Sequence, residues 1–251
     1  MSKTAFLLIG HGSRNAQANA GVYQLAELVS EQLPSEQIEV AFMEVSEPSI
    51  EQVCLRLSET GITHIVALPV MLMAAGHVQN DLPSILESVE RELPVTIRFI
   101  PGLSVSQNII SAAKSRIDEA CIESIGDGTT ALIVVGSGSS IEGAGDNLAK
   151  LATGLGKELN CTKSLSCFTG IAKPDLRDAV ESVKEHCQKV IVFPCFLFSG
   201  FLSNKVALLA KEIDREIDGI QFILVEPFNC HTGVVSECVE LLVSAKEEIE
   251  S

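Results

Sequence analysis

The chain has 251 residues, of which 46% are hydrophobic, so it can bury the core of one large domain or two medium ones. Its 18 Lys and Arg against 33 Asp and Glu give a net charge of −15, which argues against a nucleic-acid backbone or an anionic membrane surface as its main partner. The eight cysteines contain no CxxC motif and are interpreted as reduced, mostly buried thiols.

The apolar segments near the start are short. The run over residues 5–10 is too short for a secretory signal, and the longest apolar stretch, residues 65–76, is interrupted by Pro69. A helix needs about 20 apolar residues to span a bilayer. We therefore expect a cytoplasmic protein without a membrane span.

Apolar strands alternate with amphipathic helices along the first half of the chain. The pattern predicts strands over residues 5–9, 38–43 and 65–72, and helices over residues 15–33, 49–59 and 79–92. Strands that are apolar throughout, joined by connections of helix length, indicate a parallel sheet covered on both faces by helices. The predicted fold class is α/β.

The second half repeats the first. Residues 4–10, TAFLLIG, match residues 130–136, TALIVVG, at an offset of 126. Further pairs at offsets of 126 or 125 are Phe42 and Phe168, Pro48 and Pro174, Pro69 and Pro194, and Leu72 and Leu197. This self-similarity predicts an internal duplication with one domain over residues 1–126 and a second over residues 127–251. The junction is expected near residues 125–128, where turn-forming residues separate a helix from the next strand.

Three ionisable residues of the first copy are absent from the second. His11, Glu44 and His77 correspond by the offset to Ser137, Gly170 and Leu202. The apolar positions of the two copies stay similar while two imidazoles and one carboxylate occur in one copy alone. The comparison predicts one catalytic half and one supporting half.

The same three residues each follow a predicted strand and are spaced 33 residues apart, one βα unit per step. Ligands of open parallel sheets bind at the carboxyl ends of the strands, so His11, Glu44 and His77 are expected to converge there. Two imidazoles and a carboxylate suit a divalent ion such as Fe²⁺ or Co²⁺, and a histidine can also accept a proton near neutral pH. Structural roles stay open: His11 could orient its turn, and Glu44 could stabilise a helix start. His77 could be a solvated loop residue or an N-terminal helix contact.

Two Gly-rich turns, at residues 10–14 and 136–140, connect a strand to a helix and present backbone N–H groups as potential anion sites. Neither turn is a P-loop or a complete GxGxxG motif, so nucleotide binding has little support. The candidate contacts for the carboxylates of a macrocyclic ligand are Gly12, Ser13, Arg14, Ser137, Gly138 and Ser139, with Lys173 and Lys205 as further positive partners.

The motifs resemble one known family. Residues 7–14 (LLIGHGSR), 42–44 (FME) leading to Pro48, and 68–72 (LPVML) running into 76–78 (GHV) are similar to the sirohydrochlorin chelatases of the CbiX type. Residues 193–200 (FPCFLFSG) resemble the second half of the long, duplicated form of that family.

The resemblance implies two similar chelatase-like α/β lobes that enclose a cleft for the macrocycle. It implies insertion of Fe²⁺ or Co²⁺ into sirohydrochlorin with release of two protons, in siroheme or cobalamin biosynthesis. It assigns metal handling and proton acceptance to His11 and His77, and makes Glu44 the acidic residue of the same cleft. The sequence lacks the His-rich stretch and the C-terminal Cys motif of some relatives, so no iron–sulfur cluster is expected.

Two rival functions stay open from the sequence. The same cleft could carry a metal or a tetrapyrrole without turnover, or the chain could be an unrelated duplicated α/β enzyme that binds a phosphorylated small molecule at its Gly-rich turns. The expected partners are sirohydrochlorin and a divalent ion, without nucleic acid or membrane. Because the duplication supplies two lobes within one chain, a monomer is expected.

Overall fold

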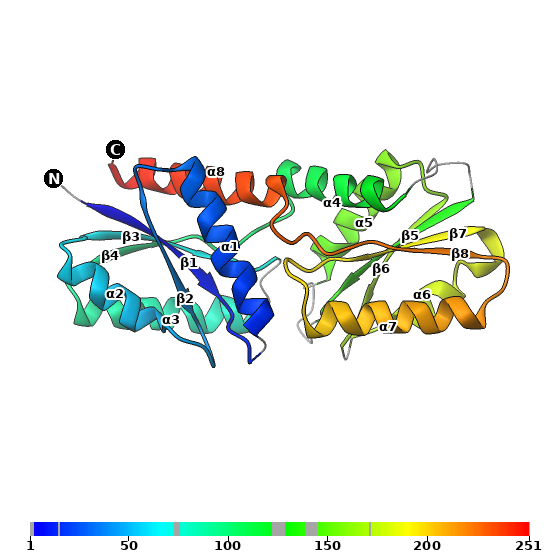
Figure 1. The fold of residues 1–251 in the computed structure, drawn as a ribbon, viewed down its shortest axis with the longest axis horizontal. Helices are drawn as coiled ribbons and strands as arrows, with labels where there is room; N and C mark the ends of the chain where they lie inside the picture. Colours follow the sequence, from blue (N-terminus) through cyan, green and yellow to red (C-terminus); the bar gives the residue numbers. More distant parts are fainter. Residues whose placement is uncertain are drawn as a thin grey trace. The chain divides into compact units, whose positions relative to one another are not determined.

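The structure is a computed structural model that describes residues 3–14, 16–72, 76–121, 129–138, 145–170 and 172–250, with the backbone alone at 17, 18 and 76–80. Two compact units make up the chain (Figure 1). The first contains Met1–Ser104 and Thr232–Ser251, and the second contains Val105–His231.

The first unit is built on one parallel sheet in the order β2-β1-β3-β4. Its strands are β1 (Thr4–Gly10), β2 (Gln37–Phe42), β3 (His64–Pro69) and β4 (Thr96–Phe99). Its helices are α1 (Ala16–Gln32), α2 (Ile50–Glu59), α3 (Gly76–Glu92) and α8 (Thr232–Glu250). The strand β1 lies between β2 and β3, which places the ends of these three strands side by side.

Burial of both sheet faces explains why the strands read as continuous apolar runs. Ala5, Leu7 and Ile9 of β1 belong to a core cluster with side chains of α2 and α3. Successive residues of a strand point to opposite faces, so Phe6 and Leu8, which are also fully buried, point to the other face. The predicted α/β fold, with a parallel sheet covered on both faces, is confirmed.

The second unit repeats this architecture with the sheet order β6-β5-β7-β8. Its strands are β5 (Thr130–Gly136), β6 (Lys163–Phe168), β7 (Lys189–Pro194) and β8 (Gln221–Leu224). Its helices are α4 (Gln107–Ala120), α5 (Asp146–Glu158), α6 (Leu176–Glu181) and α7 (Phe201–Glu216), with a 3₁₀ turn η1 (Lys184–His186). Individual hydrogen bonds recur as well: Phe42 N donates to Pro48 O at 2.9 Å, and Phe168 N donates to Pro174 O at 3.0 Å.

The compact units differ from the sequence repeats in their last helix. Helix α4 follows β4 in the sequence but belongs to the second unit, and α8 follows β8 but belongs to the first. On α4, the Arg116 guanidinium donates two hydrogen bonds to Phe228 O, at 2.8 and 3.2 Å. On α8, Lys246 Nζ lies 2.8 Å from the Glu36 carboxylate. The predicted repeat junction at residues 125–128 lies outside the described residues, and domains over 1–126 and 127–251 stay a prediction.

All eight cysteines are free thiols, and five of them are buried. Burial raises the pKa of Cys54 and of Cys195 to about 12, which keeps these thiols protonated and therefore poor metal ligands. The expectation that most of the thiols are buried is confirmed. No helix within the described residues is long and apolar enough to cross a membrane.

Candidate active site

The carboxyl ends of β1 and β2 bring two of the predicted site residues together. Gly10 and Phe42 are register partners, and Glu44 N donates to His11 O at 2.9 Å, so the backbones of the two loops are joined directly after the strands. His11 is exposed and Glu44 is half-buried. The ring Nδ1 of His11 lies 3.4 Å from Gly12 O, a contact too long to be a strong hydrogen bond.

Gly12 makes the close approach of these loops possible. Its φ is +93°, and a Cβ at this position would lie 1.8 Å from Glu44 O. Glycine alone adopts a positive φ without a steric cost and leaves space for a neighbouring backbone. The glycine inside the motif GHGS therefore allows the loops of His11 and Glu44 to lie close together. The motif needs this glycine for its backbone structure and the histidine for its chemistry.

Ser46, two residues after Glu44, also joins the two loops. Its hydroxyl donates to Ser13 O at 3.0 Å and accepts from Ser13 N at 3.1 Å. Asn19 Nδ2 of α1 donates to the Ser46 hydroxyl at 2.9 Å and to Ser13 O at 2.8 Å. This network fixes the loop that carries His11 to the loop that carries Glu44.

Replacement of Ser46 by alanine is expected to lower the free energy of unfolding by about 1–3 kcal/mol, because it removes the part-buried hydroxyl that bonds to Ser13 and Asn19. Urea unfolding followed by circular dichroism measures the change. Ser244→Ala, at an exposed serine of α8, is the matched control and is expected to unfold like the wild type. If both variants unfold alike, the network does not stabilise the loops.

Between Glu44 and Ser46, the chain makes a tight turn that holds Val45 at a φ of +46° with its side chain 65% exposed. Ser46 N donates to Glu44 O at 2.6 Å across this turn. A β-branched residue with a positive φ is strained by about 1–3 kcal/mol, and such strain persists where surrounding bonds over-determine the backbone. The bonds from Glu44 and Ser46 to the neighbouring loop supply that constraint.

The third predicted residue, His77, lies in the first turn of α3, which begins at Gly76. The prediction that His77 lies in a loop is wrong: the helix begins three residues earlier than the pattern indicated. Its strand, β3, is the neighbour of β1 on the side away from β2, so the three residues follow three adjacent parallel strands. The side chain of His77 is outside the described residues. Within the part of the chain that is described, no three His, Cys, Asp or Glu side chains form a group that could hold a metal.

The second unit has no room for a carboxylate at the position of Glu44. A Cβ on Gly170 would lie 2.7 Å from Ser137 O, so this loop approaches more closely than a side chain allows. Ser137 is exposed, and Gly138 has a φ of +81°, which matches Gly12 in the first unit. Ser139 lies outside the described residues. The difference between the copies is therefore built into the backbone as well as into the side chains.

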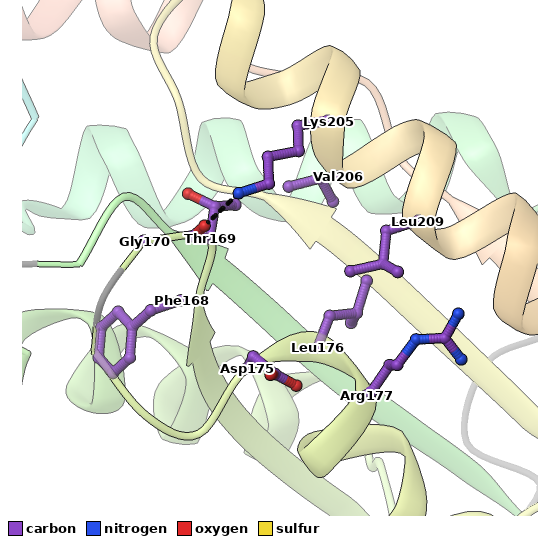
Figure 2. Close-up of a pocket in the computed structure, with 9 residues that line it drawn as sticks. All are labelled: Phe168, Thr169, Gly170, Asp175, Leu176, Arg177, Lys205, Val206 and Leu209. Carbon is purple, nitrogen blue, oxygen red and sulfur yellow. Dashed lines mark hydrogen bonds between the residues drawn. The ribbon is translucent and has the colours of Figure 1, made fainter.

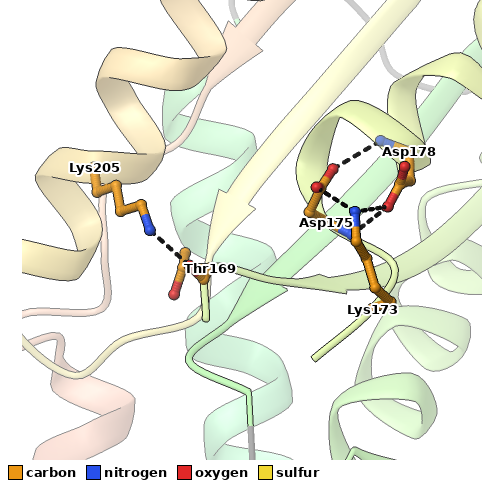
Figure 3. Close-up of polar contacts among 5 residues, drawn as sticks. All are labelled: Thr169, Lys173, Asp175, Asp178 and Lys205. Atoms are coloured by element: carbon orange, nitrogen blue, oxygen red, sulfur yellow. Dashed lines mark hydrogen bonds and ion pairs between the residues drawn. The ribbon is translucent and has the colours of Figure 1, made fainter. Parts of the chain in front are cut away.

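The predicted positive partners have different surroundings. Arg14 is exposed. Figure 3 shows Lys173 Nζ between two carboxylates, 2.6 Å from Asp175 and 2.7 Å from Asp178, and the hydrogen bond from Lys173 lowers the pKa of Asp175. Lys205 Nζ instead donates to a neutral acceptor, Thr169 O, at 2.8 Å. Within the described residues, Lys173 is therefore paired with carboxylates, whereas Lys205 is bonded to a neutral carbonyl.

A pocket of about 310 Å³ beside Lys205 was not predicted from the sequence (Figure 2). It lies at the carboxyl end of β6, between the loop that follows this strand and the helices α6 and α7. The repeat offset was the signal that could have found it, because Thr169 and Gly170 occupy the places of Met43 and Glu44.

Comparisons of the sequence and of the structure with known proteins point to the same family. The family model described as CbiX matches the chain twice, over residues 5–120 and 131–245. A sirohydrochlorin ferrochelatase of Priestia megaterium is 29% identical over 248 residues, which cover 96% of this chain and 91% of that protein. A sirohydrochlorin cobaltochelatase of the same organism is 27% identical, covering 90% of this chain and 74% of that protein. SirB from Bacillus subtilis with Fe³⁺ has the same fold, with a TM-score of 0.87, 21% identity, and coverage of 99% of this chain and 97% of that one.

Proposed function

Because the chain belongs to the CbiX family, we propose that it inserts Fe²⁺ or Co²⁺ into sirohydrochlorin and releases two protons from the macrocycle. The observation that carries the proposal is the junction of His11 and Glu44 at the carboxyl edge of a parallel sheet, in one repeat of a duplicated chain. The two Priestia megaterium relatives are a ferrochelatase and a cobaltochelatase, so both metals are candidate substrates.

The residues of this site can perform both parts of the reaction. The His11 imidazole and the Glu44 carboxylate offer one nitrogen and one oxygen donor, and His77 is our proposed second imidazole. Fe²⁺ and Co²⁺ accept such mixed donors and still have open coordination positions for an incoming ligand. The metal ion is a substrate that leaves with the product. A site of two or three donors suits such an ion because it leaves part of the coordination shell open.

Proton removal is the second part. Two pyrrole N–H bonds break as the four nitrogens of the macrocycle bind the metal, and the two protons need acceptors of suitable pKa. An unperturbed histidine has a pKa of about 6.5 and accepts a proton at neutral pH. We propose that His11 and His77 accept these protons and that Glu44 stabilises the resulting positive charge.

Anaerobic absorbance of sirohydrochlorin tests the proposal. Addition of the protein with Co²⁺ or Fe²⁺ is expected to accelerate the spectral change of metallation over the spontaneous rate, with turnover of more than one macrocycle per chain. Tight binding of the macrocycle without acceleration would favour a carrier. The absence of any interaction with sirohydrochlorin would exclude both functions.

We also propose that the protein works as a cytoplasmic monomer without a nucleic-acid or membrane partner. Its net charge of −15 and the two repeats within one chain support this proposal. A dimer mass in light scattering would contradict it.

A further inference from the structure

The pocket of the second unit combines an apolar interior with a cation at its rim. Phe168, Leu176, Val206 and Leu209 line it, and Lys205 reaches its edge from α7 (Figure 2). Pockets of this kind bind ligands with an apolar body and a few polar groups, because the apolar walls supply affinity and the polar groups fix orientation. The volume of about 310 Å³ fits part of a larger ligand, such as one substituted ring.

The repeat relation shows that the charge at this edge has changed sign between the units. By the offsets of 126 and 125 residues, Glu44 and Glu51 of the first unit correspond to Gly170 and Arg177, and Asn80 corresponds to Lys205. Two changes go the other way, since Asp175 and Asp178 stand where the first unit has Ser49 and Gln52. Both carboxylates pair with Lys173, at 2.6 and 2.7 Å, and this lysine itself stands where the first unit has Glu47. The first unit thus offers acidic donors to a cation, and the second unit offers a cation to an anion.

Lys205 is the cation of the pocket that is available to a ligand. Arg177 is paired with the Glu216 carboxylate, whereas Lys205 donates a hydrogen bond to the neutral carbonyl oxygen of Thr169. In the parts of the chain that the structure describes, Lys205 has no ion pair. An ammonium bound to a carbonyl still has two hydrogens to donate, and a carboxylate is its natural additional acceptor.

An exposed aromatic ring lies one helical turn before this lysine. Phe201 begins α7 with its side chain 77% exposed, and residues four apart share one face of a helix. Lys205 lines the pocket, so the helix face that carries Phe201 is also the face that reaches the pocket. A flat ring and a cation on the same helix face suit a flat, apolar ligand that bears carboxylates.

We propose that this pocket binds a peripheral carboxylate of the tetrapyrrole, with Lys205 as its ion-pair partner and Phe201 against the flat ring system. The inference rests on the proposed function, because it assigns part of the same substrate. A small free carboxylate could bind to Lys205 in the same way as a carboxylate of the tetrapyrrole. The experiment therefore measures the binding of both kinds of ligand.

The test is the binding of metal-free sirohydrochlorin, followed by its absorbance, to the full chain. Lys205→Ala is expected to raise the Kd about tenfold, and to raise KM for sirohydrochlorin with little change in kcat. Lys205→Arg is expected to bind within about threefold of the wild type because it retains the charge. Lys211→Ala removes an exposed lysine of the same helix outside the pocket and is expected to bind like the wild type.

Several outcomes would overturn the inference. One is an equal affinity of the wild type and Lys205→Ala for sirohydrochlorin. Another is an equal loss of affinity in Lys205→Arg and Lys205→Ala, which would show that the positive charge does not determine binding. Binding of propionate that depends on Lys205, while sirohydrochlorin binding does not, would assign the pocket to a free carboxylate. If the wild type metallates sirohydrochlorin but Lys205→Ala has an unchanged KM, this inference fails alone. If the wild type does not bind sirohydrochlorin at all, the proposed function fails with it.

Discussion

The double variant His11→Ala with His77→Ala is expected to lower the rate of enzymatic metallation at least about a thousandfold, to near the spontaneous rate. The reason is that it removes both imidazoles that we propose as metal donors and proton acceptors, and a positioned general base alone contributes about 10²–10⁴ in rate. Anaerobic absorbance of sirohydrochlorin with Co²⁺ measures this rate directly. The single variants are expected to fall between the double variant and the wild type.

The matched control is His186→Ala, which removes an exposed histidine of the second unit. It is expected to metallate at the wild-type rate. Binding of metal-free sirohydrochlorin is expected to survive in the double variant, which separates loss of chemistry from loss of fold. A double variant with wild-type turnover would refute the assignment of His11 and His77 and would leave the fold and family as they are.

Gly12→Ala is expected to lower the free energy of unfolding by about 2–5 kcal/mol and to abolish most of the activity. Alanine at a φ of +93° is strained, and its Cβ would lie 1.8 Å from Glu44 O, so the two loops must separate. Separation breaks the bond from Glu44 N to His11 O and moves the two side chains apart. Urea unfolding and the metallation assay measure the two effects on one preparation.

Gly154→Ala is the matched control, because this glycine lies in α5 with nothing within 4 Å of an added Cβ. It is expected to raise the free energy of unfolding by about 0.5–1 kcal/mol, since alanine loses less conformational freedom in a helix than glycine does. A Gly12→Ala variant that is as stable and active as the wild type would show that the loops have another way to meet.

Much of the fold follows from periodicity alone. The apolar runs of β1 and β3 predicted a parallel sheet, because central strands that are buried on both faces require apolar side chains at nearly every position. The repeat was readable for the same reason, since the core positions of both copies obey one packing constraint. Comparison of the copies then singled out His11, Glu44 and His77 as residues that the core does not explain.

The sequence by itself therefore determined the α/β fold, the duplication and the three candidate residues, because each is recorded in local pattern or in the internal offset. Only the tertiary structure decided that α4, which ends the first repeat, belongs to the second unit and that α8, which ends the second repeat, belongs to the first. Helix packing depends on non-local contacts that no periodicity encodes. The tertiary structure also decided that α3 begins at Gly76, so His77 lies in a helix. The neutral partner of Lys205 and the ion pairs of Lys173 and Arg177 were likewise unreadable, because a charged side chain looks the same in sequence whether a carboxylate faces it or not.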